Sequence, residues 1–183
     1  MSALSVFYLV LPFPLAFILH DAEEVVVQHR WMLRHQDGLA EKFPKLIPVI
    51  HHLLRLGTKE FALAAFEELL ILLLATCYVL LQGKYSTELW SALFLAFSLH
   101  LLIHFFQSLL VRGYVPGLIT SLMLLPYCYL GLQSIWSVMS GVEMVLLGIA
   151  GVTFMVANLL FAHCMSVRIF TVTLHSKHKY DEK

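Results

Sequence analysis

Charged residues are scarce in this chain of 183 residues. Only 13% of the residues are Asp, Glu, Lys or Arg, and 60% are hydrophobic, whereas an ordinary soluble domain is closer to a quarter charged. The basic residues are scattered along the chain and form no stripe that could contact phosphates, so we expect no nucleic-acid partner. The composition excludes an ordinary soluble domain and predicts a polytopic membrane protein.

Cysteine is scarce as well, which excludes a disulfide framework. Cys77, Cys128 and Cys164 are odd in number and all lie within apolar segments, where cysteine is typical of packing. The N-terminus lacks the positively charged region of a signal peptide, so we expect the first apolar segment to be retained as a membrane span.

Five apolar windows are long enough to cross a bilayer, which takes roughly 20 residues of helix. They are Leu4–Val27, Glu60–Leu81, Leu89–Val111, Val115–Ile135 and Val142–Phe170. Short loops between the later windows favour antiparallel packing of neighbouring helices, and Gly148 and Gly151 would permit close helix approach. The sequence therefore predicts an all-α, polytopic membrane helical bundle, as one domain over residues 1–174 followed by a disordered polar tail at 175–183.

The stretch Gln28–Lys59 differs from the spans because it carries six Lys and Arg residues together with Pro44 and Pro48. We interpret it as a loop whose second half, Leu46–Leu56, forms a short amphipathic helix in the membrane interface. Positively charged loops stay in the cytoplasm, and five spans place this stretch, Arg112 and the basic tail on one side. An integral membrane protein with its N-terminus outside and its C-terminus cytoplasmic is therefore expected.

The most informative motif is His20-Asp21-Ala22-Glu23-Glu24, at the end of the first window. Residues at i, i+3 and i+4 share one face of a helix, so His20, Glu23 and Glu24 lie together. Ionisable groups cost about 2.5–3.5 kcal/mol each near the centre of a membrane helix, so a shared proton, a salt bridge or a metal ion is needed. We favour the metal; the alternative is that the carboxylates only mark the membrane exit.

Histidine and glutamate recur at a similar depth on other windows. With a rise of about 1.5 Å per residue, His20 lies about 12 Å from the cytoplasmic end of its span, and Glu67 and His104 lie about 10 Å from theirs. His163 lies at a similar level, and His100 shares a face with His104 one turn deeper, although this pair could also serve only to link helices.

The predicted metal ligands are His20, Glu24, Glu67, His100, His104 and His163. Glu23 and Glu68 are predicted to act as the catalytic base or to support the ligands. Asn158 and His163 do not share a face, so only one of them is expected in the site. Imidazole and carboxylate suit a divalent metal such as zinc or iron, and the number of ligands allows one or two ions.

These residues favour a metal-dependent intramembrane enzyme that acts on a lipid or other apolar small-molecule substrate. Its other predicted partners are the lipid bilayer and a second copy of the chain in a homo-oligomer. Hydrolysis is the first choice of reaction. A di-iron oxidase or hydroxylase is the next, although the Glu-x-x-His and His-x-x-His-His motifs of such proteins are absent. An ion or proton transporter would use the same residues but lacks the expected inverted repeat, and a structural partner subunit is the remaining alternative.

The motif also resembles a known family. His20-Asp21-Ala22-Glu23-Glu24 is similar to the namesake motif of the HXXEE-domain family of small integral membrane proteins. The segment from His100 to His104 and Gln107, followed by Tyr114-Val115-Pro116-Gly117, resembles its second block, except that His100 stands where the family pattern has Asn. The resemblance implies a membrane protein with metal-dependent chemistry and supplies no reaction.

Overall fold

The protein is all-helical over the residues that the structure, a computed structural model, describes: the backbone of residues 6–181 and the side chains of residues 8–170. The elements are the π-helix η1 (Val6–Val10), α2 (Pro12–Lys42), the 3-10 helix η2 (Pro44–Leu46), α3 (Ile47–Leu54), α4 (Thr58–Leu80), α5 (Ser86–Val111), α6 (Leu118–Trp136) and α7 (Gly141–Asp181). The tail predicted at 175–183 falls outside the described side chains, so its disorder stays a prediction.

Among the described residues, four helices are long and apolar enough to cross a membrane: α4, α5, α6 and the Gly141–Phe170 part of α7. Their bounds lie within a few residues of the last four predicted windows, because apolar composition and length fix them. The first window covers η1 and the first half of α2, where Asp21, Glu23 and Glu24 interrupt the apolar run. A fifth span and the orientation of the termini therefore stay predictions.

The stretch after Gln28 is not a loop at its start, which corrects the sequence interpretation. Helix α2 continues to Lys42, because this segment is rich in helix-forming residues and the next proline is Pro44. The structure has a helix within Leu46–Leu56, α3, with a proline in its first turn. Its place in the membrane interface stays a prediction.

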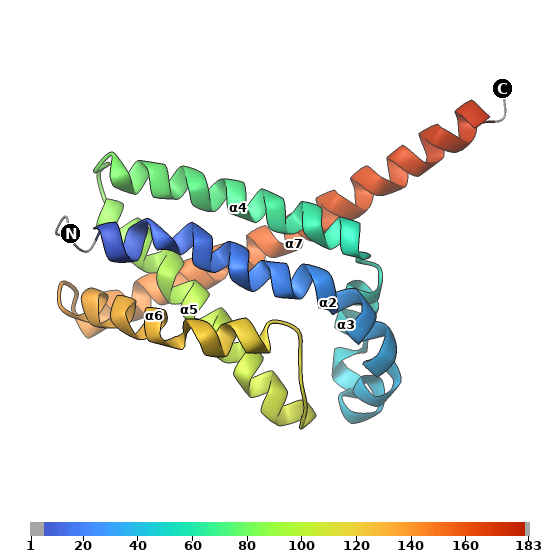
Figure 1. Ribbon diagram of the computed structural model, residues 1–183, viewed down its shortest axis with the longest axis horizontal. Helices are drawn as coiled ribbons and strands as arrows, with labels where there is room; N and C mark the ends of the chain where they lie inside the picture. Colours follow the sequence, from blue (N-terminus) through green and yellow to red (C-terminus); the bar gives the residue numbers. More distant parts are fainter. Residues whose placement is uncertain (1–5, 182–183) are drawn as a thin grey trace.

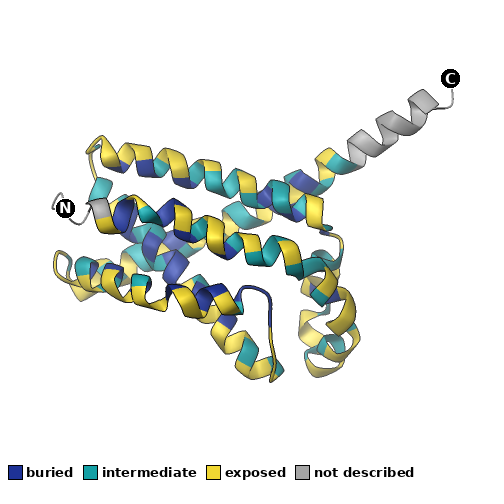
Figure 2. Ribbon diagram, viewed as in Figure 1, coloured by how far each residue is buried: buried dark blue, intermediate teal, exposed yellow. Residues whose placement is uncertain are grey.

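The helices pack lengthwise into one bundle, with α2 in contact with α4 and α6, and α5 in contact with α4, α6 and α7 (Figure 1). Phe94 of α5 is fully buried in the core of this bundle. Figure 2 shows exposed residues along the outward sides of the helices, and several of these are large and apolar, such as Leu74 at 71% exposure and Leu81 at 83%. An apolar exterior around a small core is what a lipid environment requires.

Close packing of α7 against α5 depends on Gly151. A Cβ atom at this position would overlap the backbone carbonyl of Ala92, whereas a Cβ at Gly148 would meet nothing within 4 Å. Only one of the two glycines predicted to permit close approach therefore lies at a helix contact.

This contact yields a prediction with a matched control. Replacing glycine by alanine inside a helix usually stabilises it by up to about 1 kcal/mol, and Gly148→Ala should follow that rule. Gly151→Ala should instead lower the unfolding temperature in detergent, because overpacking costs on the order of 1–3 kcal/mol. Equal unfolding temperatures for the two variants would show that α5 and α7 do not pack as described.

Candidate metal centre

His20 and Glu24 come from the same face of α2, one helical turn apart. The His20 side chain is completely buried, and its Nε2 atom lies 4.0 Å from Oε2 of Glu24. Glu24 is itself mostly shielded, with 12% of its side chain exposed. The i, i+4 spacing therefore places an imidazole and a carboxylate oxygen side by side inside the bundle.

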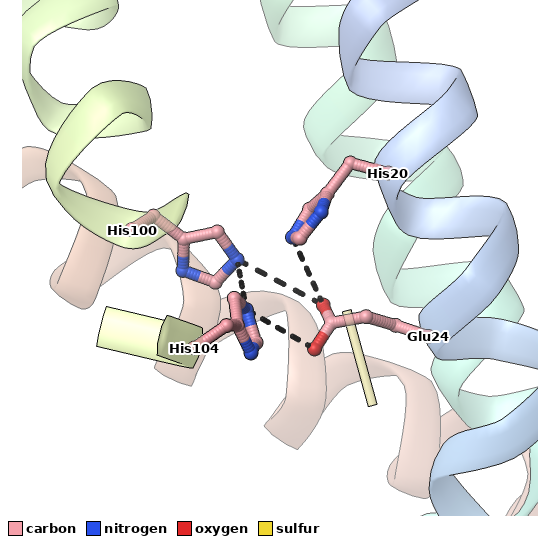
Figure 3. Close-up of side chains that lie close together, drawn as sticks. All are labelled: His20, Glu24, His100 and His104. Atoms are coloured by element: carbon pink, nitrogen blue, oxygen red, sulfur yellow. Dashed lines mark hydrogen bonds and ion pairs between the residues drawn. The ribbon is translucent and has the colours of Figure 1, made fainter. Parts of the chain in front are cut away.

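His100 and His104 project from α5 toward the same point, again from positions one turn apart. Their Nε2 atoms are 3.0 Å from each other. Nε2 of His104 lies 3.5 Å from Glu24 Oε1, and Nε2 of His100 lies 3.9 Å from Glu24 Oε2. Figure 3 shows the three imidazoles around the Glu24 carboxylate.

These four side chains, which we call the His/Glu group, could hold a metal ion. Each of His20, Glu24, His100 and His104 offers one ligand atom, and all four atoms lie within 4.8 Å of one another. Ligand atoms about 2.0–2.1 Å from a tetrahedral zinc ion are about 3.3 Å apart, so only small side-chain movements separate the group from coordination geometry. Nε2 of His20 is buried and has no hydrogen-bond partner among the described residues, as a free ligand atom would be.

The orientation of the His20 ring is set from α6. Nδ1 of His20 lies 3.1 Å from the Thr120 hydroxyl oxygen, and that hydroxyl lies 2.6 Å from Glu23 Oε2. Because an ionised carboxylate only accepts, Thr120 donates its single hydrogen to Glu23 and accepts from Nδ1–H of His20. The proton is then on Nδ1, and the Nε2 lone pair faces the other three ligand atoms.

Glu23 is held by the start of α6 and by the loop before it. Its carboxylate accepts hydrogen bonds from the Thr120 amide at 2.8 Å and the Ile119 amide at 3.3 Å, groups that have no partner within the helix. The Tyr114 hydroxyl donates a third at 2.6 Å; burial and this bond raise the pKa of Tyr114, which keeps the phenol protonated. Glu23 thus positions His20 and points away from the metal ligands.

Gly117 brings the loop between α5 and α6 close to two imidazoles. Its φ angle is +81°, which favours glycine, and a Cβ atom would lie 2.9 Å from Cε1 of His20 and 3.0 Å from Cε1 of His104. A side chain at this position would therefore strain the loop and displace both rings.

The remaining predicted residues lie nearby but outside the His/Glu group. Oε2 of Glu67 accepts a hydrogen bond of 3.1 Å from Asn158, and Nδ1 of His163 lies 3.3 Å from Nε2 of His52. Glu68 lines the same cavity as Glu24 and His100, and its Oε1 is buried without a hydrogen-bond partner. A ligand role for Glu67 and His163, and catalysis by Glu68, stay predictions.

Sequence reasoning assigns no role to Thr120 or Gly117, and it places His52 in solvent or among lipid headgroups, whereas His52 contacts His163. Thr120 orients His20 from 100 positions away in the chain. No local sequence pattern marks this pair, because the contact exists only in the folded bundle. The nearest sequence signal is the Tyr114-Val115-Pro116-Gly117 turn, because Thr120 then falls in the first turn of the next helix.

Comparison with known proteins finds one family. A family model described as "protein of unknown function with HXXEE motif" matches residues 11–131. The matched region contains the whole His/Glu group together with Glu23, Gly117 and Thr120. No curated protein and no solved structure matches the chain.

Thr120 can be tested by removing its hydroxyl group alone. Thr120→Val keeps the shape of the side chain but leaves the Nδ1–H of His20 without an acceptor, so zinc affinity should fall about tenfold to a hundredfold. Thr120→Ser should keep most of the affinity, as measured by competition with a chromophoric chelator. Equal affinities for the two variants would contradict the role given to this hydroxyl.

Gly117 offers a second test with a control in the same loop. Gly117→Ala should weaken zinc binding on the order of tenfold by displacing His20 and His104. A Cβ at Gly113 meets nothing within 4 Å, so Gly113→Ala should bind zinc as the unaltered protein does. A Gly117→Ala protein with full affinity would show that the loop does not pack against the imidazoles.

Proposed function

Because this chain belongs to the HXXEE family, whose description names a motif and no activity, its function has to be argued from its own site: we propose a metal-dependent intramembrane enzyme that hydrolyses a lipid or other apolar substrate. The single observation that carries the proposal is the convergence of three imidazoles and one carboxylate, from α2 and α5, on one point. That ligand set suits zinc or iron.

An apolar cavity beside the His/Glu group supports an apolar substrate. Glu24 and His100 line it together with apolar side chains from α2, α4, α5 and α7. Such a lining suits an acyl or prenyl chain.

A second cavity, also lined mainly by apolar side chains, adjoins the group. Glu24, His100 and His104 line it, and so do Gln28 and Gln107. In the proposed enzyme water reaches the His/Glu group through this second cavity, where the two glutamines lie, and the first cavity holds the substrate.

Glu68 is the proposed general base. A divalent metal ion at the His/Glu group would supply Lewis acidity and a more acidic water molecule. Glu68 would accept a proton from a water molecule as the water oxygen adds to the carbonyl carbon of an ester or amide, and would pass that proton to the departing oxygen or nitrogen. The buried Oε1 of Glu68, which lacks a hydrogen-bond partner, is available for that transfer.

A single ion is the simplest occupant of the site. The other predicted ligands, Glu67 and His163, pair with Asn158 and His52 instead, so the four convergent atoms are left to one metal. We place the group in the cytoplasmic half of the bilayer, because it lies toward the basic second half of α2.

Metal content per chain tests this proposal directly. Protein purified in detergent without chelator or nickel resin should contain about one metal ion per chain by mass spectrometry. His20→Ala and His104→Ala should retain much less of it through purification, because each variant lacks one of the four ligand atoms. His35→Ala, on the exposed part of α2, and Glu67→Gln should retain it.

The identity of the metal separates the reaction classes. Zinc near one per chain supports hydrolysis and directs the search to esters and amides of apolar chains. Two irons per chain would contradict the hydrolase and favour an oxidase. A chain that binds no metal even after reloading would overturn the proposal and leave the buried residues to ion or proton transport.

A further inference from the structure

Basic side chains gather at the end of the bundle where α2 and α5 finish. Lys42 ends α2, Lys45 lies in η2, and Arg112 follows α5, and all three are exposed. Among the described residues, the ion pairs are those of the His/Glu group alone. Asp37 and Glu41, the carboxylates in this part of α2, therefore form no ion pair with these cations, which are available to an anion from outside the chain.

The second cavity extends from the His/Glu group toward this basic end. Along α5 its lining begins at His100 and ends at Val111, which is about 16 Å of helix at 1.5 Å per residue. Its outer part is lined by apolar side chains of α2, η2, α3 and α5, such as Leu39, Leu46 and Val111. An acyl chain suits this part of the cavity, because it removes apolar surface from water.

Lys42 is held at the rim of the second cavity. Its Nζ atom donates a hydrogen bond of 2.6 Å to the Leu110 carbonyl oxygen and lies 5.6 Å from the centre of the Phe43 ring. Both Leu110 and Phe43 line the cavity. The carbonyl belongs to the last turn of α5, which leaves it without a partner in the helix. Because an ammonium group has three hydrogens to donate, two remain for an anion.

We propose that the second cavity binds an anionic phospholipid of the surrounding bilayer. One acyl chain lies in the cavity, and the phosphate lies beside Lys42, near the further charges of Lys45 and Arg112. Basic pockets between membrane helices are typical sites for anionic headgroups, and several unpaired cations favour a lipid with net negative charge over a zwitterionic one.

A bound acyl chain has a consequence for the His/Glu group. It displaces water from the second cavity, so in the proposed enzyme the phospholipid would slow hydrolysis. Only this consequence rests on the proposed function; the binding of the phospholipid does not.

Lipid retention tests the inference without a known reaction. The full-length protein is released in a mass spectrometer from nanodiscs that contain equal amounts of phosphatidylglycerol and phosphatidylcholine with the same acyl chains. It should retain phosphatidylglycerol about fivefold more often, as expected from one cation near a lipid phosphate. Lys42→Gln, which keeps a donor for Leu110, should lose this preference, and Lys42→Arg should keep it. Lys84→Gln, an exposed lysine between α4 and α5 and outside the cavity lining, should keep it too.

A second pair of variants tests whether the acyl chain enters the cavity. Leu53 lines the second cavity and Leu54 does not, and both are half-buried on α3. Leu53→Trp should reduce the retention of phosphatidylglycerol by filling the cavity, whereas Leu54→Trp should leave it unchanged. If the tryptophan variants do not fold, the Lys42 and Lys84 variants decide alone.

Equal retention of the two lipids by the unaltered protein would overturn the inference, as would equal preferences in Lys42→Gln and Lys84→Gln. Full retention by a folded Leu53→Trp protein would also overturn it, because the lipid would then bind only on the outer surface.

The His20→Ala protein separates this inference from the proposed function, because His20 lines neither cavity. It should keep the preference for phosphatidylglycerol while it holds less metal. If His20→Ala loses the preference and Lys42→Gln keeps it, the phosphate binds at the metal and the inference is wrong. A chain that prefers phosphatidylglycerol but binds no metal would refute the metalloenzyme only.

Discussion

The contact between Glu23 and the start of α6 is the interaction on which the rest of the site depends. Consecutive residues on a helix point about 100° apart, so Glu23 and Glu24 face different neighbours. Glu23 satisfies the free amides of α6 and, through Thr120, fixes the proton on Nδ1 of His20. Glu24 meets the two histidines of α5. The His-x-x-Glu-Glu spacing is thus explained physically. The Glu23 carboxylate connects α2 to α6 and orients the His20 imidazole, and the Glu24 carboxylate is itself one of the proposed metal ligands.

The few polar side chains of the site interact strongly because their surroundings are apolar. Charges and hydrogen bonds are stronger, and unpaired polar atoms more costly, where water is excluded. Nε2 of His20 has no hydrogen-bond partner among the described residues, and an ion at the centre of the His/Glu group would provide one. The carboxyl groups of Asp21 and Glu68 line the adjoining cavity. The same lack of water therefore connects the proposed metal and the proposed base.

The sequence predicted what depends on local periodicity. Apolar length located α4 to α7, and spacing of one turn placed His20 with Glu24 and His100 with His104 on common faces. It did not predict that α2 continues beyond Gln28, because the charged residues there end the apolar run although they favour a helix. It also assigned no role to Thr120 or Gly117, whose contacts join segments far apart in the chain. Depth alone could not place Glu67, since residues at one level still face different neighbours, and Asn158 is its partner.

X-ray absorption spectroscopy of the zinc-loaded protein tests the central claim most directly, because it reports the ligands of the metal itself. The account predicts one shell of nitrogen and oxygen atoms at about 2.0–2.2 Å, made by the four protein ligands and the water that hydrolysis needs, with the outer-shell pattern of three imidazoles. Glu24→Gln should alter this shell, whereas Glu67→Gln should leave it unchanged. A sulfur ligand, a second metal about 3.5–4 Å away, or fewer than three imidazoles would contradict the assignment of His20, Glu24, His100 and His104 as one mononuclear site.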